Sequence, residues 1–454
     1  MLVVLEEGSV WSWGQCIWGQ LGLGGKGILS AGGSTTNPTR VGGVEVFGDR
    51  IVSASCGYTH SAAVSATGSV FTWGQARHAM LGHGDEEIKM IPTRIGKQML
   101  AGLSALQVAC GRAYTVVLTV NGCVWTVGHG SMGQLGHGNR DNKSQLTRVS
   151  PEAFSGAVIV MIAAGFSHTV ASDMVGGIWS WGGGQTGRLG HGDQEDQLIP
   201  TQITDSAGRG RCVLVSTGIF HTVAVMNTGE LLGWGSNKDG QIGLGHAIQV
   251  VTPTRIGGAD AFGGSRVITA AAGGHHTIAV NDQGVVWSFG CGYNGQLGVD
   301  STHTLHTPAR IPRLYFGCNS IVSVSAGLQH SSAVTVEGTV YTWGKPQGLG
   351  HGDGWRRVTI PTRVALPSCK RVGRCHYKKL SHLHALAFAM GTHNVLSIRS
   401  DRDSPCAFAN LPMELIQRIV NACVSWPEGQ VGEMRGMVQM LGGHAKCSPS
   451  MLHT

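Results

Sequence analysis

The sequence predicts an all-β fold, a seven-bladed β-propeller of four-stranded blades followed by a short C-terminal helical tail. Three observations support this fold class. A short strand-like segment that closes with Gly recurs seven times, at intervals of 53 to 60 residues. Glycine occupies 71 of 454 positions, about twice its ordinary share, and charged residues make up only 13%. Such a chain is rich in turns, and repeated units with several short strands are typical of propeller blades.

The seven copies share four short elements that keep the same order. One is the strand that closes with Gly, as in Val10-Trp11-Ser12-Trp13-Gly14, and the others are a Leu-Gly or Ile-Gly turn, a Pro-Thr-Arg element and a Gly-x-x-His strand start. Aromatic and small residues alternate in the closing strand, so one face of it carries the apolar bulk. Closing seven units into a ring buries that face. The closing glycines are Gly14, Gly74, Gly128, Gly182, Gly235, Gly290 and Gly344.

The two ends of the propeller sequence compete for one place in the ring. Residues 2–5 precede the strand at Val10 and lack a Gly-x-x-His start, whereas residues 385–388 follow a late start at His384. Either segment can pair with the Val10 strand, and the sequence leaves this choice open. We expect one propeller domain at residues 1–390 and a tail at residues 391–454.

Cysteine usage and hydropathy exclude several classes of protein. The N-terminus lacks the basic region of a secretory signal, and no apolar run approaches the roughly 18 residues of a membrane helix. Twelve cysteines without a CxxC pair fit neither a disulfide scaffold nor a standard zinc site. We therefore expect free thiols and a cytoplasmic or nuclear location. No catalytic residue, cofactor site or metal site is predicted.

Repeated histidines and arginines are candidate site residues, and for both we favour structural roles. The turn histidines lie on different blades, too far apart to share one metal ion, so we predict hydrogen bonds at turns or strand ends. We expect the Gly-x-x-His histidines to cap the inner strand of each blade. The arginines of the Pro-Thr-Arg element could form a basic ring, but we predict an acidic or carbonyl partner for each of them in the same or the adjoining blade. The turn histidines are His83, His137, His191 and His351, and the arginines are Arg40, Arg94, Arg148, Arg255, Arg310 and Arg363.

A basic stretch lies near the end of the propeller sequence. No acidic residue occurs between Asp353 and Asp401, and the net charge of the whole chain is +7. Such a cluster attracts anionic partners, which include nucleic acid, chromatin, an acidic lipid surface or an acidic protein. A solvated loop of the last blade is the alternative. The residues of the predicted patch are Arg356, Arg357, Lys370, Arg371, Arg374, Lys378 and Lys379.

The tail contains one predicted helix, near residues 411–424. Asn410 suits its cap and Pro412 suits its first turn. Leu411, Leu415 and Ile419 recur every four residues and form an apolar stripe for a partner. The stretch 411–416 resembles the start of an F-box, which implies recruitment to a ubiquitin-ligase scaffold. Packing of the helix on the propeller, or on a segment missing from this sequence, is the alternative.

The phased pattern resembles the regulator of chromosome condensation repeat. Trp181-Gly182, Leu189-Gly190-His191-Gly192, Pro200-Thr201 and Gly218-x-x-His221-Thr222 carry the resemblance, which covers about residues 1–390. It implies the propeller fold and, for the founding member, nucleotide exchange on the GTPase Ran and docking on chromatin. Exchange in that family depends on a wedge-like insertion between blades, and the even repeat lengths here contain no obvious wedge. We expect a monomeric, non-catalytic protein-interaction scaffold, with nucleotide exchange on, or regulation of, a Ran-like small GTPase as the implied specialisation.

Two other functions are alternatives, one that the repeat suggests and one that the F-box-like stretch of the tail suggests. Plant UV-B photoreceptors resemble it and absorb light through tryptophans in Gly-Trp-Arg-His-Thr copies. Here Phe166 and Ile219 occupy two of the tryptophan places, so photoreception is not expected. The other alternative is a substrate-receptor subunit or fragment of a ubiquitin ligase. Propellers host many unrelated activities, so the repeat alone does not choose between a GTPase regulator and a ligase subunit.

Overall fold

The computed structural model describes residues 1–5, 7–27, 34–42, 44–204, 210–258, 260–346, 348–352 and 357–366. The chain divides into two units, Met1–Arg399 and Ser400–Thr454, and all described residues lie in the first. The predicted tail helix, with Leu411, Leu415 and Ile419, and the predicted domain boundary at residue 390 both lie outside the described residues. In these described ranges, no helix combines the length and the apolar character needed to cross a membrane.

The described strands form seven antiparallel sheets, and each sheet is one blade. Blade 1 contains β1 (Leu2–Val4), β2 (Val10–Gln15) and β3 (Ser34–Arg40). Blade 2 contains β4 (Ile51–Cys56), β5 (His60–Ser65), β6 (Val70–Gly74) and β7 (Lys89–Arg94). Blade 3 contains β8 (Ala105–Cys110), β9 (Tyr114–Thr119), β10 (Val124–Gly128) and β11 (Lys143–Arg148). Blade 4 contains β12 (Ile159–Ala164), β13 (His168–Asp173), β14 (Ile178–Gly182) and β15 (Gln197–Gln202).

The remaining three blades repeat this order. Blade 5 contains β16 (Cys212–Thr217), β17 (His221–Met226), β18 (Leu231–Gly235) and β19 (Val250–Arg255). Blade 6 contains β20 (Val267–Ala272), β21 (His276–Asn281), β22 (Val286–Gly290) and β23 (Leu305–Arg310). Blade 7 contains β24 (Ile321–Ala326), β25 (His330–Thr335), β26 (Val340–Gly344) and β27 (Val358–Arg363). The predicted seven-bladed propeller is therefore confirmed, with four described strands in each of blades 2 to 7 and three in blade 1.

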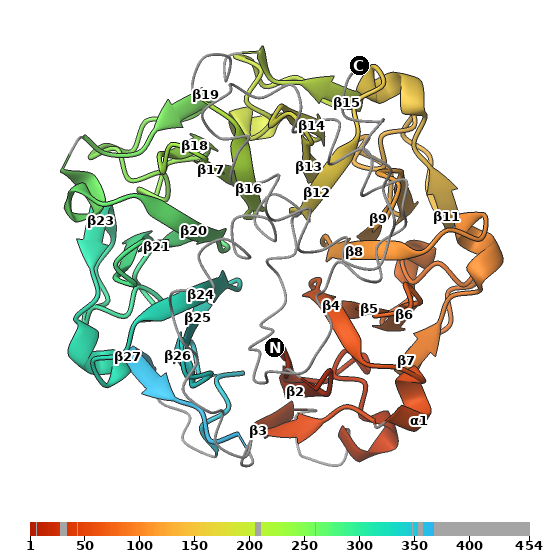
Figure 1. Cartoon of the computed structure of the whole chain (residues 1–454), viewed down its shortest axis with the longest axis horizontal. Coiled ribbons are helices and arrows are strands. Elements are labelled where there is room, and N and C mark those ends of the chain that lie inside the picture. The colour runs from red at the N-terminus through yellow and green to blue at the C-terminus, as the bar shows by residue number, and fades with distance from the viewer. Residues whose placement is uncertain are drawn as a thin grey trace, which may run out of the picture. The chain divides into compact units, whose positions relative to one another are not determined.

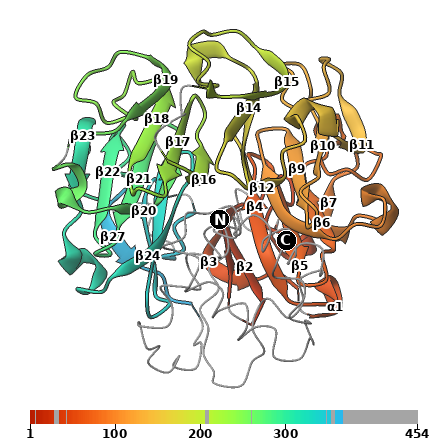
Figure 2. The same cartoon turned by 45° about the horizontal axis from the view of Figure 1, so that its top comes forward.

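Within this unit the blades follow one another around a common centre (Figure 1). The first strand of a blade is innermost and the fourth is outermost, as β16 and β19 show (Figure 1). The strands of blade 6, β20 to β23, lie side by side in chain order (Figure 2). The Pro-Thr-Arg element forms the outermost strand, where Pro92 is tolerated because an edge strand does not need every N–H in a ladder.

Short helical turns join the strands of the blades. They are α1 (Val44–Phe47), η1 (Gly24–Gly27), η2 (Arg77–Ala79), η3 (Lys97–Leu100), η4 (Pro151–Phe154), η5 (Gln185–Gly187), η7 (Ala261–Gly264) and η8 (Arg313–Phe316). The turns η2 and η5 follow the third strand of their blades and carry residues of the candidate site.

The hydrophobic core lies between blades, as the alternating pattern of the closing strands predicts. Trp13, Trp73, Trp181, Trp234 and Trp343 are completely buried. The Leu-Gly turn of each blade packs against the closing strand of the next. A Cβ on Gly190 of blade 4, for example, would lie 2.9 Å from Nε1 of Trp234 in blade 5. The turn therefore requires glycine, and each blade depends on its neighbour for its core.

The same contact closes the ring between blade 7 and blade 1. A Cβ on Gly350 would lie 2.9 Å from Trp13 Nε1. Val334 and Val340 of blade 7 share one apolar cluster with Val3 and Trp13 of blade 1. The choice that the sequence left open is also resolved, because β1 pairs with β2 through Val3 and Trp11. The competing segment, residues 385–388, lies outside the described residues.

The Gly-x-x-His histidines link adjacent blades. His60 Nε2 in blade 2 lies 2.9 Å from Thr115 Oγ1 in blade 3, and the Thr115 hydroxyl donates to the Met80 carbonyl at 2.8 Å. The hydroxyl gives its only proton to the carbonyl, so His60 must donate through Nε2–H. Burial lowers the pKa of His60 to about 4, which keeps the ring neutral. Equivalent links join His168 to Thr222, His221 to Thr277 and His276 to Ser331.

This arrangement corrects the prediction that these histidines cap the inner strand of their own blade. The ring instead crosses to the next blade, and it passes over the glycine of its own motif. A Cβ on Gly57 would lie 2.5 Å from His60 Cε1, which explains the spacing of Gly and His. Tyr114 replaces His in blade 3 and donates directly to the His168 carbonyl at 2.5 Å.

The turn histidines form hydrogen bonds inside their own blades, as predicted. His83 Nε2 lies 3.0 Å from Thr72 Oγ1, and the Thr72 hydroxyl donates to the Leu81 carbonyl at 2.7 Å. His137, His191 and His351 contact Thr126, Ser180 and Thr342 in the same way. Burial lowers the pKa of each of these histidines, to about 4 for His137. They fix the turn on the strand that precedes it.

Candidate functional site

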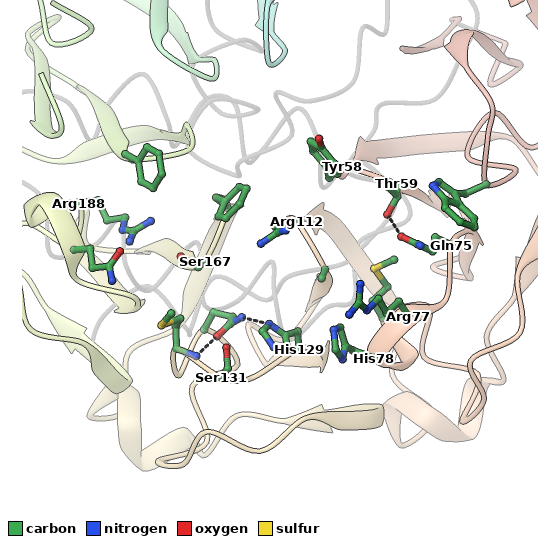
Figure 3. A pocket seen from close by; sticks show the side chains of 18 residues that line it. Tyr58, Thr59, Gln75, Arg77, His78, Arg112, His129, Ser131, Ser167 and Arg188 are labelled. Carbon is green, nitrogen blue, oxygen red and sulfur yellow. Dashed lines mark hydrogen bonds between the residues drawn. The ribbon is translucent and has the colours of Figure 1, made fainter. Parts of the chain in front are cut away.

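A pocket of about 610 Å³ lies where two sets of loops meet. One set is the x-x part of the Gly-x-x-His elements, between the first and second strands. The other set follows the third strand and includes η2 and η5. The main side chains are Trp18 of blade 1, Tyr58, Arg77 and His78 of blade 2, Arg112, His129 and Met132 of blade 3, Phe166 and Arg188 of blade 4, and Phe220 of blade 5. Figure 3 shows Arg112 and Arg188 at this pocket, with His78 and His129 beside each other.

Two arginines in the pocket lie over phenylalanine rings. The Arg112 Cζ is 4.5 Å from the centroid of Phe166, and the Arg188 Cζ is 5.1 Å from the centroid of Phe220. The first pair joins blades 3 and 4, and the second joins blades 4 and 5. In each pair the attraction between the cation and the aromatic face holds the guanidinium in place. The two ring centroids, of Phe166 and Phe220, are 6.0 Å apart. The four side chains thus form one continuous cluster.

Arg188 occupies a position that glutamine holds in most copies of the repeat. The side-chain oxygen of that glutamine accepts a backbone N–H of its own loop, as Gln134 does from Met132 at 2.9 Å. Gln20, Gln241 and Gln296 make the same contact. In blade 4 the oxygen of Gln194 takes over this role and accepts the N–H of Thr186 at 3.3 Å. Arg188 therefore does not make the loop hydrogen bond that glutamine makes at this position in other blades.

Arg188 is buried without a carboxylate partner in the described part of the chain. Only 2% of the residue is exposed, its Nη1 donates to the Ile219 carbonyl at 3.3 Å, and its Nε has no hydrogen-bond partner among the described residues. Asp196, the nearby carboxylate, is paired with Arg140 at 2.8 Å. Burial lowers the pKa of Arg188 to about 10, so the side chain still carries its charge at neutral pH.

The pocket has a positive electrostatic character. Arg77, Arg112 and Arg188 line it, and none of its lining residues is acidic. His78 and His129 pack with ring centroids 4.5 Å apart. Burial and then the neighbouring His78, Arg112 and Arg77 charges lower the pKa of His129. Among the described residues, no group of three His, Cys, Asp or Glu side chains could hold a metal ion. The residues that line the pocket provide hydrogen-bond donors and aromatic faces.

The predicted basic patch is described at one of its residues. Arg357 is exposed, and Arg356, Lys370, Arg371, Arg374, Lys378 and Lys379 lie outside the described residues. The prediction that the Pro-Thr-Arg arginines have acidic or carbonyl partners is confirmed at Arg255. Arg255 pairs with the Glu230 carboxylate of its own blade at 3.2 Å, as predicted, whereas Arg94 donates to the hydroxyl of Ser69 at 2.8 Å and, among the described residues, not to an acidic or carbonyl partner.

Arg112, Arg188 and the pocket are not among the site residues predicted from the sequence. A signal was present at both positions. At Arg188 a charged residue replaces the glutamine of the repeat, and Arg112 is the charged member of an x-x pair that holds Tyr58, Phe166 or Leu328 in other copies. Departures from a structural repeat mark residues that the fold itself does not require.

Comparison with models of protein families gives two matches along the chain. The RCC1-like domain model matches residues 1–316, and the regulator of chromosome condensation (RCC1) repeat matches residues 321–347. The chain belongs to the RCC1-like domain family. This confirms the resemblance that the repeat pattern indicated.

Several relatives of this RCC1-like chain are curated proteins. The ultraviolet-B receptor UVR8 of Arabidopsis thaliana is 33% identical over 368 residues, which cover 78% of this chain and 81% of the receptor. The E3 ubiquitin-protein ligase HERC2 of Homo sapiens is 32% identical over 281 residues, 61% of this chain but only 6% of the ligase. Protein pim1 of Schizosaccharomyces pombe is 28% identical over 358 residues, 71% of this chain and 64% of pim1.

Solved structures share the fold of the RCC1-like chain. Human WBSCR16 has a TM-score of 0.70 at 26% identity, covering 79% of this chain and 94% of that structure. Prp20p of Saccharomyces cerevisiae, described with its binding properties to Gsp1p and histones, has a TM-score of 0.69 at 23% identity and covers 81% of this chain and 88% of that structure. These likenesses support the propeller architecture.

Proposed function

We propose that this RCC1-like chain is a non-catalytic regulatory scaffold that binds protein partners through the loops around the pocket. The observation that carries the proposal is the placement of Arg188. Most repeated residues hold blades together. Arg188 does not make the hydrogen bond that glutamine makes at this position of the repeat, and it lines a pocket. A rigid ring that presents variable loops is a suitable frame for recognition. We expect the protein to act as a monomer in the cytoplasm or the nucleus.

The proposal is tested by affinity purification with mass spectrometry. The bait is the intact chain, and the test variant combines Trp18→Ala and Tyr58→Ala, two pocket residues that are 38% and 61% exposed. The matched control combines Ile199→Ala and Ile248→Ala, which are 48% and 70% exposed and do not line the pocket. We expect partners to be retained by the intact chain and the control and lost with the test variant. Equal recovery with all three baits would show that another surface binds.

A Ran-like small GTPase is the first specialisation to test. Its support is family membership together with the likeness to Prp20p, a structure described with its binding to Gsp1p. Release of a fluorescent nucleotide from purified small GTPases should accelerate when the intact chain is added. The Trp18→Ala, Tyr58→Ala variant is the control. No acceleration with any GTPase, while partner capture succeeds, would leave the scaffold proposal standing and reject exchange activity.

A ubiquitin-ligase subunit or fragment is the second candidate. The observation in its favour is the 32% identity to HERC2 over 281 residues. Co-purification of cullin scaffold proteins with the intact chain, and their loss when the chain is cut after residue 400, would support a receptor that uses the predicted tail helix. Retention of cullins by the shortened chain would reject that role for the tail.

The basic stretch that includes Arg357 is proposed as a second surface, for an anionic partner such as nucleic acid, chromatin or acidic lipid. The support is its sequence, which places Lys and Arg without intervening acidic residues. If phosphates are engaged, raising salt from about 50 to 200 mM should weaken binding steeply through counterion release. A flat response to salt would reject this surface.

A further inference from the structure

We infer that the pocket binds an acidic segment of a protein partner, with Arg112 and Arg188 donating hydrogen bonds to its carboxylates. This inference rests on the proposed function and names the chemistry of the partner. It starts from Arg188, which is 2% exposed, lines the pocket and has an unpartnered Nε in the described part of the chain. A guanidinium buried without a counter-ion is costly, and an incoming carboxylate removes that cost.

The stacked geometry leaves both guanidinium groups ready to donate. Arg112 lies over Phe166 and Arg188 over Phe220, at 4.5 and 5.1 Å from the ring centroids. A guanidinium that covers an aromatic face keeps its in-plane N–H groups available for acceptors. Carboxylates match this donor pattern through paired, charge-assisted hydrogen bonds. The rings therefore orient the arginines before a ligand arrives, which lowers the entropy lost on binding.

The charges around the pocket select a negative ligand. No lining residue is acidic, and two carboxylates in the loops that follow the third strands of blades 4 and 5 are already engaged. Asp196 pairs with Arg140 at 2.8 Å and accepts the Gly184 N–H at 2.9 Å. Asp239 pairs with His275 at 3.1 Å. The arginines thus keep their capacity for an anion that comes from outside.

The size and rim of the pocket favour a polypeptide segment over a free small ion. A volume of about 610 Å³ lies within the range of about 300 to 1,000 Å³ for binding pockets. Trp18 and Tyr58 stand at the pocket with 38% and 61% of their surface exposed. Tryptophan, tyrosine and arginine are the residue types that contribute most to protein interfaces. A polypeptide segment can contact both parts of the pocket, with acidic side chains bound to the arginines and an apolar side chain packed on Trp18 and Tyr58.

The experiment measures binding of a fluorescein-labelled, blocked peptide to the purified full-length chain by fluorescence anisotropy. The peptide alternates Glu and Asp with Leu and Gly, and the reference peptide has Gln and Asn in place of the acids. We expect the acidic peptide to bind at least about 10-fold more tightly, as lost charge-assisted hydrogen bonds predict. Arg188→Gln and Arg112→Gln should each weaken binding of the acidic peptide by a similar factor. Arg148→Gln, at an exposed outer-strand arginine outside the pocket, should leave binding unchanged.

Three results would overturn this inference. They are equal affinity for the acidic and amide peptides, unchanged binding by both Arg188→Gln and Arg112→Gln, or equally tight binding of inorganic phosphate alone in a competition titration. Arg112 is exposed, so its variant keeps the test valid if the change at buried Arg188 disturbs folding. Capture of a protein partner without peptide binding would contradict this inference alone. Peptide binding without any pocket-dependent protein partner would contradict the proposed function alone.

Discussion

At the scale of single residues, the buried histidines of the Gly-x-x-His elements hold neighbouring blades together. His221 is completely buried, and its Nε2 lies 3.0 Å from Thr277 Oγ1 in the next blade. The Thr277 hydroxyl donates to the Gln241 carbonyl at 2.7 Å. A neutral imidazole with its proton on Nε2 is the form that fits this chain of hydrogen bonds.

Replacement of His221 by Ala should destabilise the propeller. The change leaves a cavity and removes one inter-blade hydrogen bond, at an expected cost of about 2 to 4 kcal/mol in the free energy of unfolding. His221→Tyr should cost less than half as much, because Tyr114 fills the equivalent place in blade 3 and bonds to the next blade. Urea unfolding of both variants measures the difference. Equal losses for Ala and Tyr would contradict a role in linking the blades.

The same histidines predict a loss of stability in mild acid. Burial lowers the pKa of His60 to about 4 and of His221 and His276 to about 3. The unfolded chain binds protons near pH 6.5 and the folded chain does not, so the free energy of unfolding falls as pH drops below about 6.5. Each histidine contributes at most about 1.4 kcal/mol per pH unit. Thermal unfolding between pH 7.5 and 5 tests this, and a constant Tm across that range would be inconsistent with neutral, buried rings.

At the scale of elements, the Leu-Gly turn joins each blade to the next. The sequence predicts this turn and the strands around it, because Gly, Pro and alternating aromatic residues recur in phase. The sequence does not show which residues of the next blade the turn contacts. The partner of Gly350 is Trp13, at the opposite end of the propeller sequence, and a contact over that separation becomes evident only in the closed ring.

Gly350→Ala should weaken the closure of the ring. The residue has φ +82°, and a Cβ there would lie 2.9 Å from Trp13 Nε1. Gly192→Ala is the matched control, since Gly192 has φ +93° and the nearest atom to its Cβ would be 3.8 Å away. In both variants the left-handed conformation of the alanine lowers the free energy of unfolding by about 1 to 2 kcal/mol. In Gly350→Ala, overpacking against Trp13 lowers it by a further amount of about 1 to 3 kcal/mol. Equal free energies of unfolding for the two variants would argue against tight packing at the closure.

At the scale of the whole molecule, repetition explains what the sequence predicted and what it missed. Seven phased copies fix the blade count, the strand order and the buried face of each strand. The pocket combines side chains from five blades, and Arg112 is 54 residues away from Phe166 in the sequence. Its residues follow no shared pattern, because each loop contributes a different side chain. Two departures from the repeat could have indicated the site, the arginine at position 188 in place of glutamine and the charged residue at position 112.

Arg188 is the clearest example of a residue that we expect to serve a partner and not the propeller fold. Glutamine is the structural residue at this position in other blades, so Arg188→Gln should fold normally. It also removes a buried, unpaired charge, which favours stability.

The most direct test measures thermal unfolding and acidic-peptide binding on the same preparation of Arg188→Gln. We expect a Tm equal to or above that of the parent chain, together with at least about 10-fold weaker binding of the acidic peptide. A lower Tm with full binding would contradict this expectation, because Arg188 would then serve the fold and not the partner.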